Sequence, residues 1–381
     1  MKKLLCFLFM LLIAIPLFGS AEDSYCTIRE LHDQVESEYQ GVWQESVETQ
    51  WRTVKIHTPL IVPDADEMPV LAFRWTKEET DFSLLPGDGW TQRSKDLYES
   101  KGLISVKRAD QLPTPAGWQK WETSGTEHLY GIVDFSRVFP DYGGKTLGEI
   151  RDELTALLEL LNQGRHAWDL EHPSDVMVNT ATDKASKVSQ TSYVHFSCYP
   201  MFEGIPVFHE LGFYLQYDLP VTRDAFFPSS LSMGIGPYGE MSISYTPPAY
   251  KRLADDIPLM NLEKVQDTLR KEVEAGHIRN ILEMRLGYAT VNLSGDPESY
   301  TAASQAIWHV DAWWCSNGKK EIRPEDPDYP SGSYGRPEYV RIAIDAQTGE
   351  ILSIAGDAAP DQKKVKRIGD YQGYLSWEEV R

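Results

Sequence analysis

Basic residues are scarce in this sequence. It contains 37 lysine and arginine residues against 57 aspartate and glutamate residues, a formal net charge of −20 at pH 7. Such a surface repels nucleic acids and anionic lipids, and no cluster of basic residues offsets it. We therefore expect no nucleic-acid partner.

Cysteine is scarce as well. Apart from Cys6 in the N-terminal apolar run, the chain has only Cys26, Cys198 and Cys315. An odd number does not make a disulfide framework, and no pair has the spacing of zinc ligands. Two interpretations stay open: one disulfide, best placed between Cys198 and Cys315, or three buried thiols.

Long apolar runs are limited to the N-terminus. Lys2 and Lys3 precede an apolar run of 15 residues, 4–18, and small residues follow at 19–21. This layout predicts a cleaved secretory signal over residues 1–21. An uncleaved anchor is the alternative, but the run is shorter than the roughly 20 residues that span a bilayer. We expect an exported mature chain without a transmembrane segment, carrying 35 basic and 57 acidic residues.

Two segments have the periodicity of amphipathic helices. Thr146 and Glu149 form a T-x-x-E capping box, and Asn261 is a good N-cap for the second helix. The apolar stripes match at a constant offset of 115 residues: Leu147, Ile150, Leu154 and Leu158 in the first helix, Leu262, Val265, Leu269 and Val273 in the second. Strand-like segments follow each helix. The pattern predicts an α+β protein with two tandem modules, each a helix packed on an antiparallel sheet.

A hairpin is expected at 339–352, "YVRIAIDAQTGEIL". Val340, Ile342 and Ile344 alternate with polar neighbours, as in a strand with one buried face. Gly349 supplies the positive φ that the turn requires. We divide the chain into the signal (1–21), an N-terminal region of uncertain fold (22–130) and the two modules (131–255 and 256–381).

The hairpin text "IDAQTGEIL" and the earlier "FEGIPV" at 202–207 resemble PepSY-type modules. The order of helix, long strand, aromatic strand and hairpin over 261–352 is similar to the YycH/YycI group of exported regulatory proteins. Residues 56–73 followed by both modules look like an uncharacterised family of exported proteins and lipoproteins of Gram-positive anaerobes. The resemblance implies binding or restraint of partner proteins and supplies no catalytic residues.

Candidate binding residues come from two places. In "WHVDAWW" (308–314), strand alternation puts His309, Asp311 and Trp313 on one face, where they could hold a sugar or a peptide or else pack against the neighbouring module. In the acidic stretch 323–335, the candidates for contact with a partner are Asp326, Asp328 and Tyr329.

No catalytic or metal-binding constellation is apparent. The stretch "HAWDLEH" (166–172) lacks the spacing of a metal site, and no nucleophile stands in a motif such as G-x-S-x-G. We expect no cofactor. The sequence thus favours an exported, non-catalytic binding or regulatory protein that contacts a protein or peptide at the cell envelope. An extracellular glycan-binding protein or hydrolase is the alternative.

Overall fold

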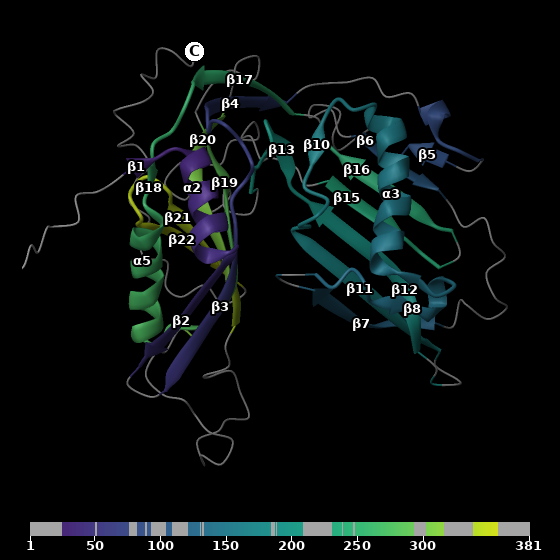
Figure 1. Ribbon diagram of the computed structural model, residues 1–381. Coiled ribbons are helices and arrows are strands. Elements are labelled where there is room, and N and C mark those ends of the chain that lie inside the picture. Colours follow the sequence, from purple (N-terminus) through teal and green to yellow (C-terminus); the bar gives the residue numbers. More distant parts are fainter. Residues whose placement is uncertain are drawn as a thin grey trace, which may run out of the picture.

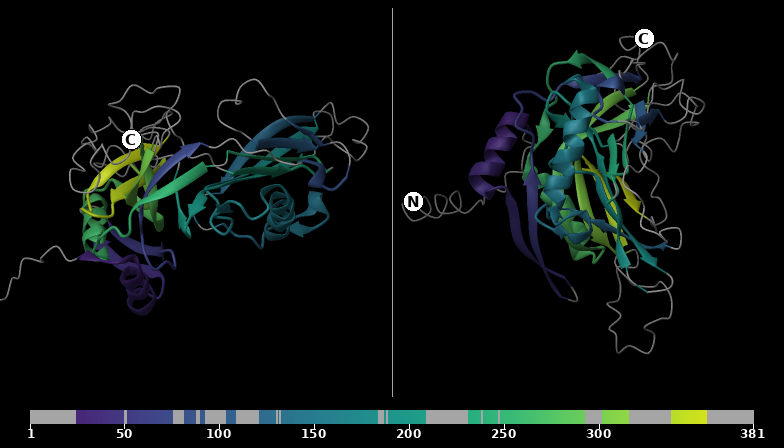
Figure 2. Two further views of the ribbon diagram at one scale, coloured as in Figure 1. Left: turned by 90° about the horizontal axis from the view of Figure 1, so that it is seen from above. Right: turned by 90° about the vertical axis from the view of Figure 1, so that its right-hand side faces the viewer.

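The chain folds into two lobes, each built on one large β-sheet (Figures 1 and 2). The computed structural model describes residues 25–49, 52–75, 82–87, 90–92, 104–108, 121–129, 131, 133–183, 187, 189–208, 231–237, 239–246, 248–292, 302–315 and 338–356. The expected signal, 1–21, lies outside these residues.

One lobe contains a seven-stranded antiparallel sheet. Its strands, in spatial order, are β5 (Trp90–Gln92), β6 (Ile104–Arg108), β16 (Met241–Tyr245), β15 (Leu231–Ile235), β12 (Ser189–Cys198), β11 (Asp175–Asp183) and β7 (Trp121–Leu129). Helix α3 (Leu147–Asn162) covers one face of this sheet (Figure 2). A short ribbon, β8 (Val138–Phe139) and β9 (Lys145–Thr146), leads into the helix.

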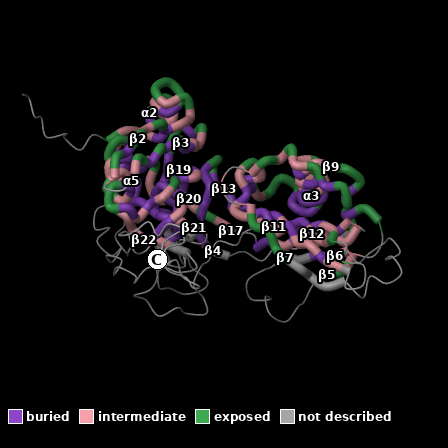
Figure 3. The backbone as a smooth tube through the Cα atoms, turned by 90° about the horizontal axis from the view of Figure 1, so that it is seen from below, coloured by how far each residue is buried: buried purple, intermediate pink, exposed green. Residues whose placement is uncertain are grey.

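Helix α3 begins where the sequence predicts. The Thr146 hydroxyl accepts from the amide of Glu149, and the Glu149 carboxylate accepts from the amide of Thr146, so both halves of the capping box are present. The predicted stripe is buried against the sheet, while the opposite side of the helix is exposed (Figure 3).

The other lobe contains an eight-stranded sheet. Its strands are β17 (Pro248–Ala254), β4 (Val70–Trp75), β20 (Ala302–Trp314), β19 (Ile278–Asn292), β3 (Thr53–Ile61) and β2 (Val42–Glu48), with β21 (Glu338–Asp345) on β20 and β22 (Ile351–Gly356) on β21. Of these pairs only β19–β3 is parallel. Helices α2 (Ile28–Gln34) and α5 (Leu262–Glu274) share its apolar core, and β1 (Tyr25–Cys26) pairs with β18 (Leu259–Met260).

The expected hairpin is confirmed as β21 and β22. The Asp345 carboxylate accepts from the amide of Gln347, and the Gly349 amide donates to the Asp345 carbonyl oxygen, each at 2.8 Å. Gly349 has φ +71°, and Val340 and Ile342 are buried. The second helix also begins at its predicted N-cap, since Asn261 accepts from the amide of Glu263.

The expectation of an α+β fold with two tandem helix-on-sheet modules is wrong. Within the described residues there are 22 strands and three α-helices, and strands of the predicted N-terminal region belong to both large sheets. Strands β2, β3 and β4 join the sheet of β19–β22, whereas β5, β6 and β7 join the sheet beneath α3. The protein is therefore mainly β. The strands of the N-terminal region enlarge both sheets, so the strands far outnumber the helices.

One lobe is inserted into the other. Strands β4 and β17 are antiparallel neighbours, with Trp75 opposite Pro248, and the chain between them builds the seven-stranded sheet. We call the described residues between 76 and 247 the inserted lobe, and the described residues of 25–75 and 248–356 the base lobe. The boundaries expected from the sequence, at 130/131 and 255/256, do not coincide with these lobes.

A short segment of the inserted lobe packs into the base lobe. This bridging segment, residues 199–208, contains β13 (Pro200–Phe202) and β14 (Ile205–Pro206), which form a small sheet with β10 (Ala167–Trp168). Phe202, Ile205 and Val207 lie in the apolar core of the base lobe. The Phe208 amide donates to the carbonyl oxygen of Tyr288 in β19 at 2.8 Å. The two lobes therefore share a packed interface as well as two chain connections.

Gly287 permits this close approach. A Cβ atom at this position would lie 2.5 Å from the carbonyl oxygen of Pro206 and 2.6 Å from the ring of Phe208. We expect Gly287→Ala to lower the free energy of unfolding by about 1–3 kcal/mol, because the bridging segment must move. Urea unfolding followed by circular dichroism measures this. Gly125→Ala, on an exposed strand position with only the Thr180 hydroxyl nearby at 3.3 Å, should change the value by less than about 0.5 kcal/mol.

A candidate binding cleft beside a charged lobe interface

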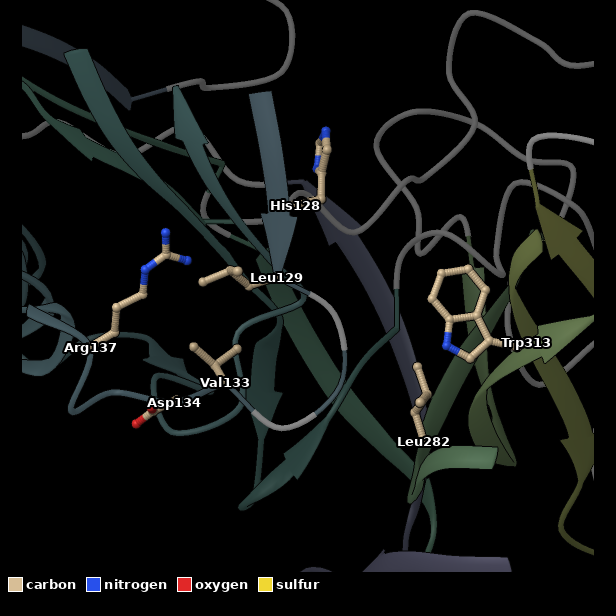
Figure 4. A pocket seen from close by; sticks show the side chains of 7 residues that line it. All are labelled: His128, Leu129, Val133, Asp134, Arg137, Leu282 and Trp313. Carbon is tan, nitrogen blue, oxygen red and sulfur yellow. The ribbon is translucent and has the colours of Figure 1, made fainter. Parts of the chain in front are cut away.

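A cleft of about 370 Å³ lies where the two lobes meet (Figure 4). The inserted lobe contributes the end of β7 and the loop after it, and the base lobe contributes one residue each from β19 and β20. The lining residues are His128, Leu129, Val133, Asp134, Arg137, Leu282 and Trp313. The cleft therefore combines an apolar surface with a few polar groups, as ligand sites usually do.

Neighbouring groups hold the polar side chains of the cleft in place. His128 Nδ1 lies 3.1 Å from a carboxylate oxygen of Asp175, and Arg137 pairs with Glu127 at 2.8 Å. The hydrogen bond from Arg137 keeps the pKa of Glu127 below its ordinary value. Asp134 accepts from the amide and hydroxyl of Ser136. Because these polar groups already have partners within the protein, a ligand would make its main contacts with the apolar residues of the cleft.

Trp313 is the largest side chain in the cleft. It is partly exposed on β20, and its ring meets the ring of Tyr339 edge-on at 6.1 Å. Leu282 in β19 lies nearby on the same side of the cleft (Figure 4). A flat aromatic ring beside a leucine can receive an apolar side chain or the face of a sugar.

Behind the cleft, β19, β20 and β21 carry charged residues on adjacent strands. Glu283 is opposite Asp311, which is opposite Arg341, and Arg285 is opposite His309. With Asp169 of the inserted lobe, these residues form what we call the charged cluster. All but Arg341 are less than 9% exposed, so the two lobes enclose the cluster.

Arg285 joins the lobes most directly. Its guanidinium pairs with the Asp169 carboxylate and donates to the His172 carbonyl oxygen at 3.1 Å. It also lies over the rings of Tyr199 and Phe208, at 5.5 and 5.6 Å from their centres. An arginine that is 3% exposed is stabilised only when such partners replace its water.

Arg341 makes the second charged connection. It donates to the Ser174 carbonyl oxygen at 2.9 Å and to the Tyr339 hydroxyl at 3.2 Å. Its Nε atom lies 3.8 Å from Asp311, and His309 Nδ1 lies at the same distance from that carboxylate.

The acids of the cluster differ in protonation. Burial alone would raise the pKa of Asp169, but the hydrogen bond from His172 and the charge of Arg285 together hold it below the ordinary value. Burial raises the pKa of Glu283 to about 7; the charge of Arg285 opposes this shift, and that of Asp311 adds to it. Asp169 is therefore ionised at neutral pH, whereas Glu283 titrates there.

The candidate residues from the sequence have different positions. Trp313 lines the cleft, while His309 and Asp311 are 2% and 7% exposed and face the inserted lobe. The sequence left two alternatives for this strand face, a binding surface or packing against the neighbouring module. His309 and Asp311 are packed in this way. Asp326, Asp328 and Tyr329 lie outside the described residues.

The cysteines and the "HAWDLEH" stretch carry no metal site. Cys26, Cys198 and Cys315 are free thiols, so no disulfide joins Cys198 to Cys315 in this structure. In the described part of the chain, no three histidine, cysteine or acidic side chains are grouped so that they could hold a metal ion.

Sequence reasoning missed Glu283, Arg285 and the role of Asp169. A signal was present, since "ILEMRLGY" places Glu283 and Arg285 two residues apart in an otherwise apolar strand. Charges that alternate with apolar residues normally indicate an exposed strand face. Here a second lobe covers that face.

Comparisons with known proteins give a weak structural match and no sequence match. No family model and no curated protein matches the chain. One solved structure, of an uncharacterized protein from Eubacterium rectale, aligns with a TM-score of 0.44 and 16% identity over 79% of this chain and 91% of that one. Among the described helices, none has the length and apolar character to cross a membrane.

Proposed function

We propose that this protein is an exported, non-catalytic binding protein that holds an extended segment of a partner protein or peptide in the cleft between its lobes. The observation that carries the proposal is the position of Trp313 and Leu282 across the cleft from the end of β7. The N-terminal signal expected from the sequence supports a site of action at the cell envelope.

Strand β7 supplies a reason to expect an extended ligand. Among the described strands it pairs with β11 alone, so it forms an edge of the seven-stranded sheet. An edge strand presents backbone N–H and C=O groups to which a peptide can add as a further strand. Residues 125–128 are exposed, and the strand ends at Leu129 inside the cleft.

The cleft also limits the chemistry of the ligand. Leu129, Val133, Leu282 and Trp313 favour at least one apolar or aromatic side chain. The chain carries a net charge of −20, which favours approach of a neutral or basic segment over an acidic one.

Replacement of Trp313 by Ala tests the proposal. Peptides are selected from a phage-displayed library of random 12-residue sequences, and their affinity for the purified protein is measured by fluorescence anisotropy. We expect Trp313→Ala to weaken binding about 30-fold, because a buried aromatic contact commonly contributes about 2 kcal/mol. Trp90→Ala changes a partly buried tryptophan on β5, outside the cleft, and should leave affinity unchanged.

The same protein is screened against cell-wall glycans, since a partly exposed tryptophan beside polar groups also suits a sugar. Recovery of peptides whose affinity depends on Trp313 supports the proposal. Glycan binding that depends on Trp313, with no peptide selected, would replace it with the glycan-binding alternative.

A further inference from the structure

Two buried carboxyl groups face each other across neighbouring strands of the base lobe. Glu283 on β19 is opposite Asp311 on β20, and they are 4% and 7% exposed. Like charges directly opposite each other on a sheet destabilise it, and enclosure by a second lobe increases this effect. The pair therefore favours a state in which one carboxyl group keeps its proton.

The neighbouring charges give the same result. The cluster contains three carboxyl groups, those of Asp169, Asp311 and Glu283, but only two guanidinium groups, those of Arg285 and Arg341. Glu283 is the fifth group, and its Oε1 atom is 3.4 Å from the Nε atom of an arginine that is already paired with Asp169. With the imidazole of His309 uncharged, the cluster is neutral when one of its three carboxyl groups is protonated and carries an excess negative charge when none is.

Two histidines and a tyrosine also lie beside the acids of the cluster. His172, on the inserted lobe, lies 3.3 Å from Asp169, and His309 lies 3.8 Å from Asp311 and stacks on Phe208. Burial raises the pKa of the Tyr339 hydroxyl, which stays protonated at neutral pH.

We propose that the lobe interface binds one proton, shared by Glu283 and Asp311, and that release of this proton to solvent loosens the contact between the lobes. Release breaks one carboxyl O–H bond and leaves one unbalanced negative charge in the interface. The charge can regain water only if the lobes move apart, because both carboxyl groups are enclosed.

The proton is positioned to affect the cleft. Leu282 directly precedes Glu283, and Trp313 lies two residues after Asp311 on the same strand face. The loop after β7 touches the same region, since a Cβ atom at Gly131 would lie 3.3 Å from that of Leu282. Movement of the lobes would change the distance between the two sides of the cleft. This last consequence, a change in ligand affinity, rests on the proposed function.

The direction of the pH dependence follows from linkage. The pKa of Glu283 is about 7 in the folded chain against an ordinary 4.5, so its proton is bound more tightly in the folded state. Stability from this group is complete below pH 4.5 and is lost as the pH rises through 7. Asp169 acts in the opposite sense at lower pH, because its pKa is depressed.

The test is urea unfolding of the full chain without ligand, from pH 5 to pH 8. We expect the unfolding equilibrium constant of the wild type to rise about 70-fold relative to that of Glu283→Gln, which cannot release a proton. Small-angle X-ray scattering should show a larger radius of gyration at pH 8 than at pH 6 for the wild type, and no change for Glu283→Gln.

Two further variants make the result specific. Asp311→Asn removes the like charge, so the pH midpoint of the wild-type effect should move downward. Glu159→Gln makes the same chemical change as Glu283→Gln on an exposed side chain of α3 and should follow the wild type. The proposal would be overturned if the unfolding equilibrium constants of the wild type and Glu283→Gln had the same pH dependence. It would also be overturned if the radius of gyration of the wild type were the same at pH 6 and pH 8. Because no peptide is present, failure of peptide binding to Trp313 would leave this result intact.

Discussion

Replacement of Arg285 by Met is expected to lower the free energy of unfolding by about 3–5 kcal/mol, since it leaves a buried carboxylate without its cation. Asp169 is 6% exposed and pairs with Arg285 across the lobe interface. Methionine retains much of the apolar part of the arginine side chain. The decrease in the free energy of unfolding therefore reflects the lost charge and hydrogen bonds more than lost packing. Urea unfolding at pH 7 gives the value.

An exposed arginine provides the matched control for this change. Arg29 also pairs with two acids, Asp64 and Asp66, but those carboxylates are 72% and 92% exposed. Arg29→Met should therefore leave the free energy of unfolding almost unchanged. The double variant Asp169→Leu, Arg285→Met should recover part of the loss, because the uncompensated charge is gone. Equal losses for the Arg285 and Arg29 variants would show that the interface ion pair contributes little.

The local elements of this fold were predictable from sequence, because local interactions determine them. Thr146 with Glu149 fixed the start of α3, and Asn261 fixed the start of α5. The hairpin followed from alternation ending at Asp345 and from the positive φ available to Gly349. In each case the deciding contacts lie within a few residues along the chain.

The arrangement of the sheets could not be predicted in the same way. Trp75 pairs with Pro248, and Leu60 with Met284, across more than 170 and 220 residues respectively. No local pattern encodes such partners, so strands of the N-terminal region were assigned to neither lobe. The α+β expectation failed for this reason.

The candidate site was only partly predictable. Trp313 was identified from strand alternation, and it lines the cleft. His309 and Asp311 share its strand face, yet the inserted lobe buries them. Whether a polar strand face meets solvent or a second lobe depends on tertiary packing, which the sequence of one strand does not reveal.

The lobe interface combines charge with aromatic packing, and the aromatic part centres on Phe208. Its ring is fully buried, stacks on His309 at 4.5 Å and meets Tyr199 edge-on at 5.0 Å. The guanidinium of Arg285 lies over the same ring. Phe208 therefore contacts both the buried cation and the neighbouring aromatic rings. Loss of this ring should therefore weaken both parts of the interface together.

Phe208→Ala is expected to lower the free energy of unfolding by about 3–5 kcal/mol, because it leaves a cavity between the lobes that the rigid β19 backbone cannot close. We also expect this variant to unfold in two separate transitions, one for each lobe, since each lobe retains its own apolar core. Tyr250→Ala is the control: that ring is 40% exposed, packs on Phe202 at 4.8 Å, and should change stability by about 1 kcal/mol or less. A Phe208 variant that loses stability but keeps one sharp transition would show that the lobes fold as a single unit, held together by the rest of the bridging segment, which packs against β19, and by the pairing of β4 with β17.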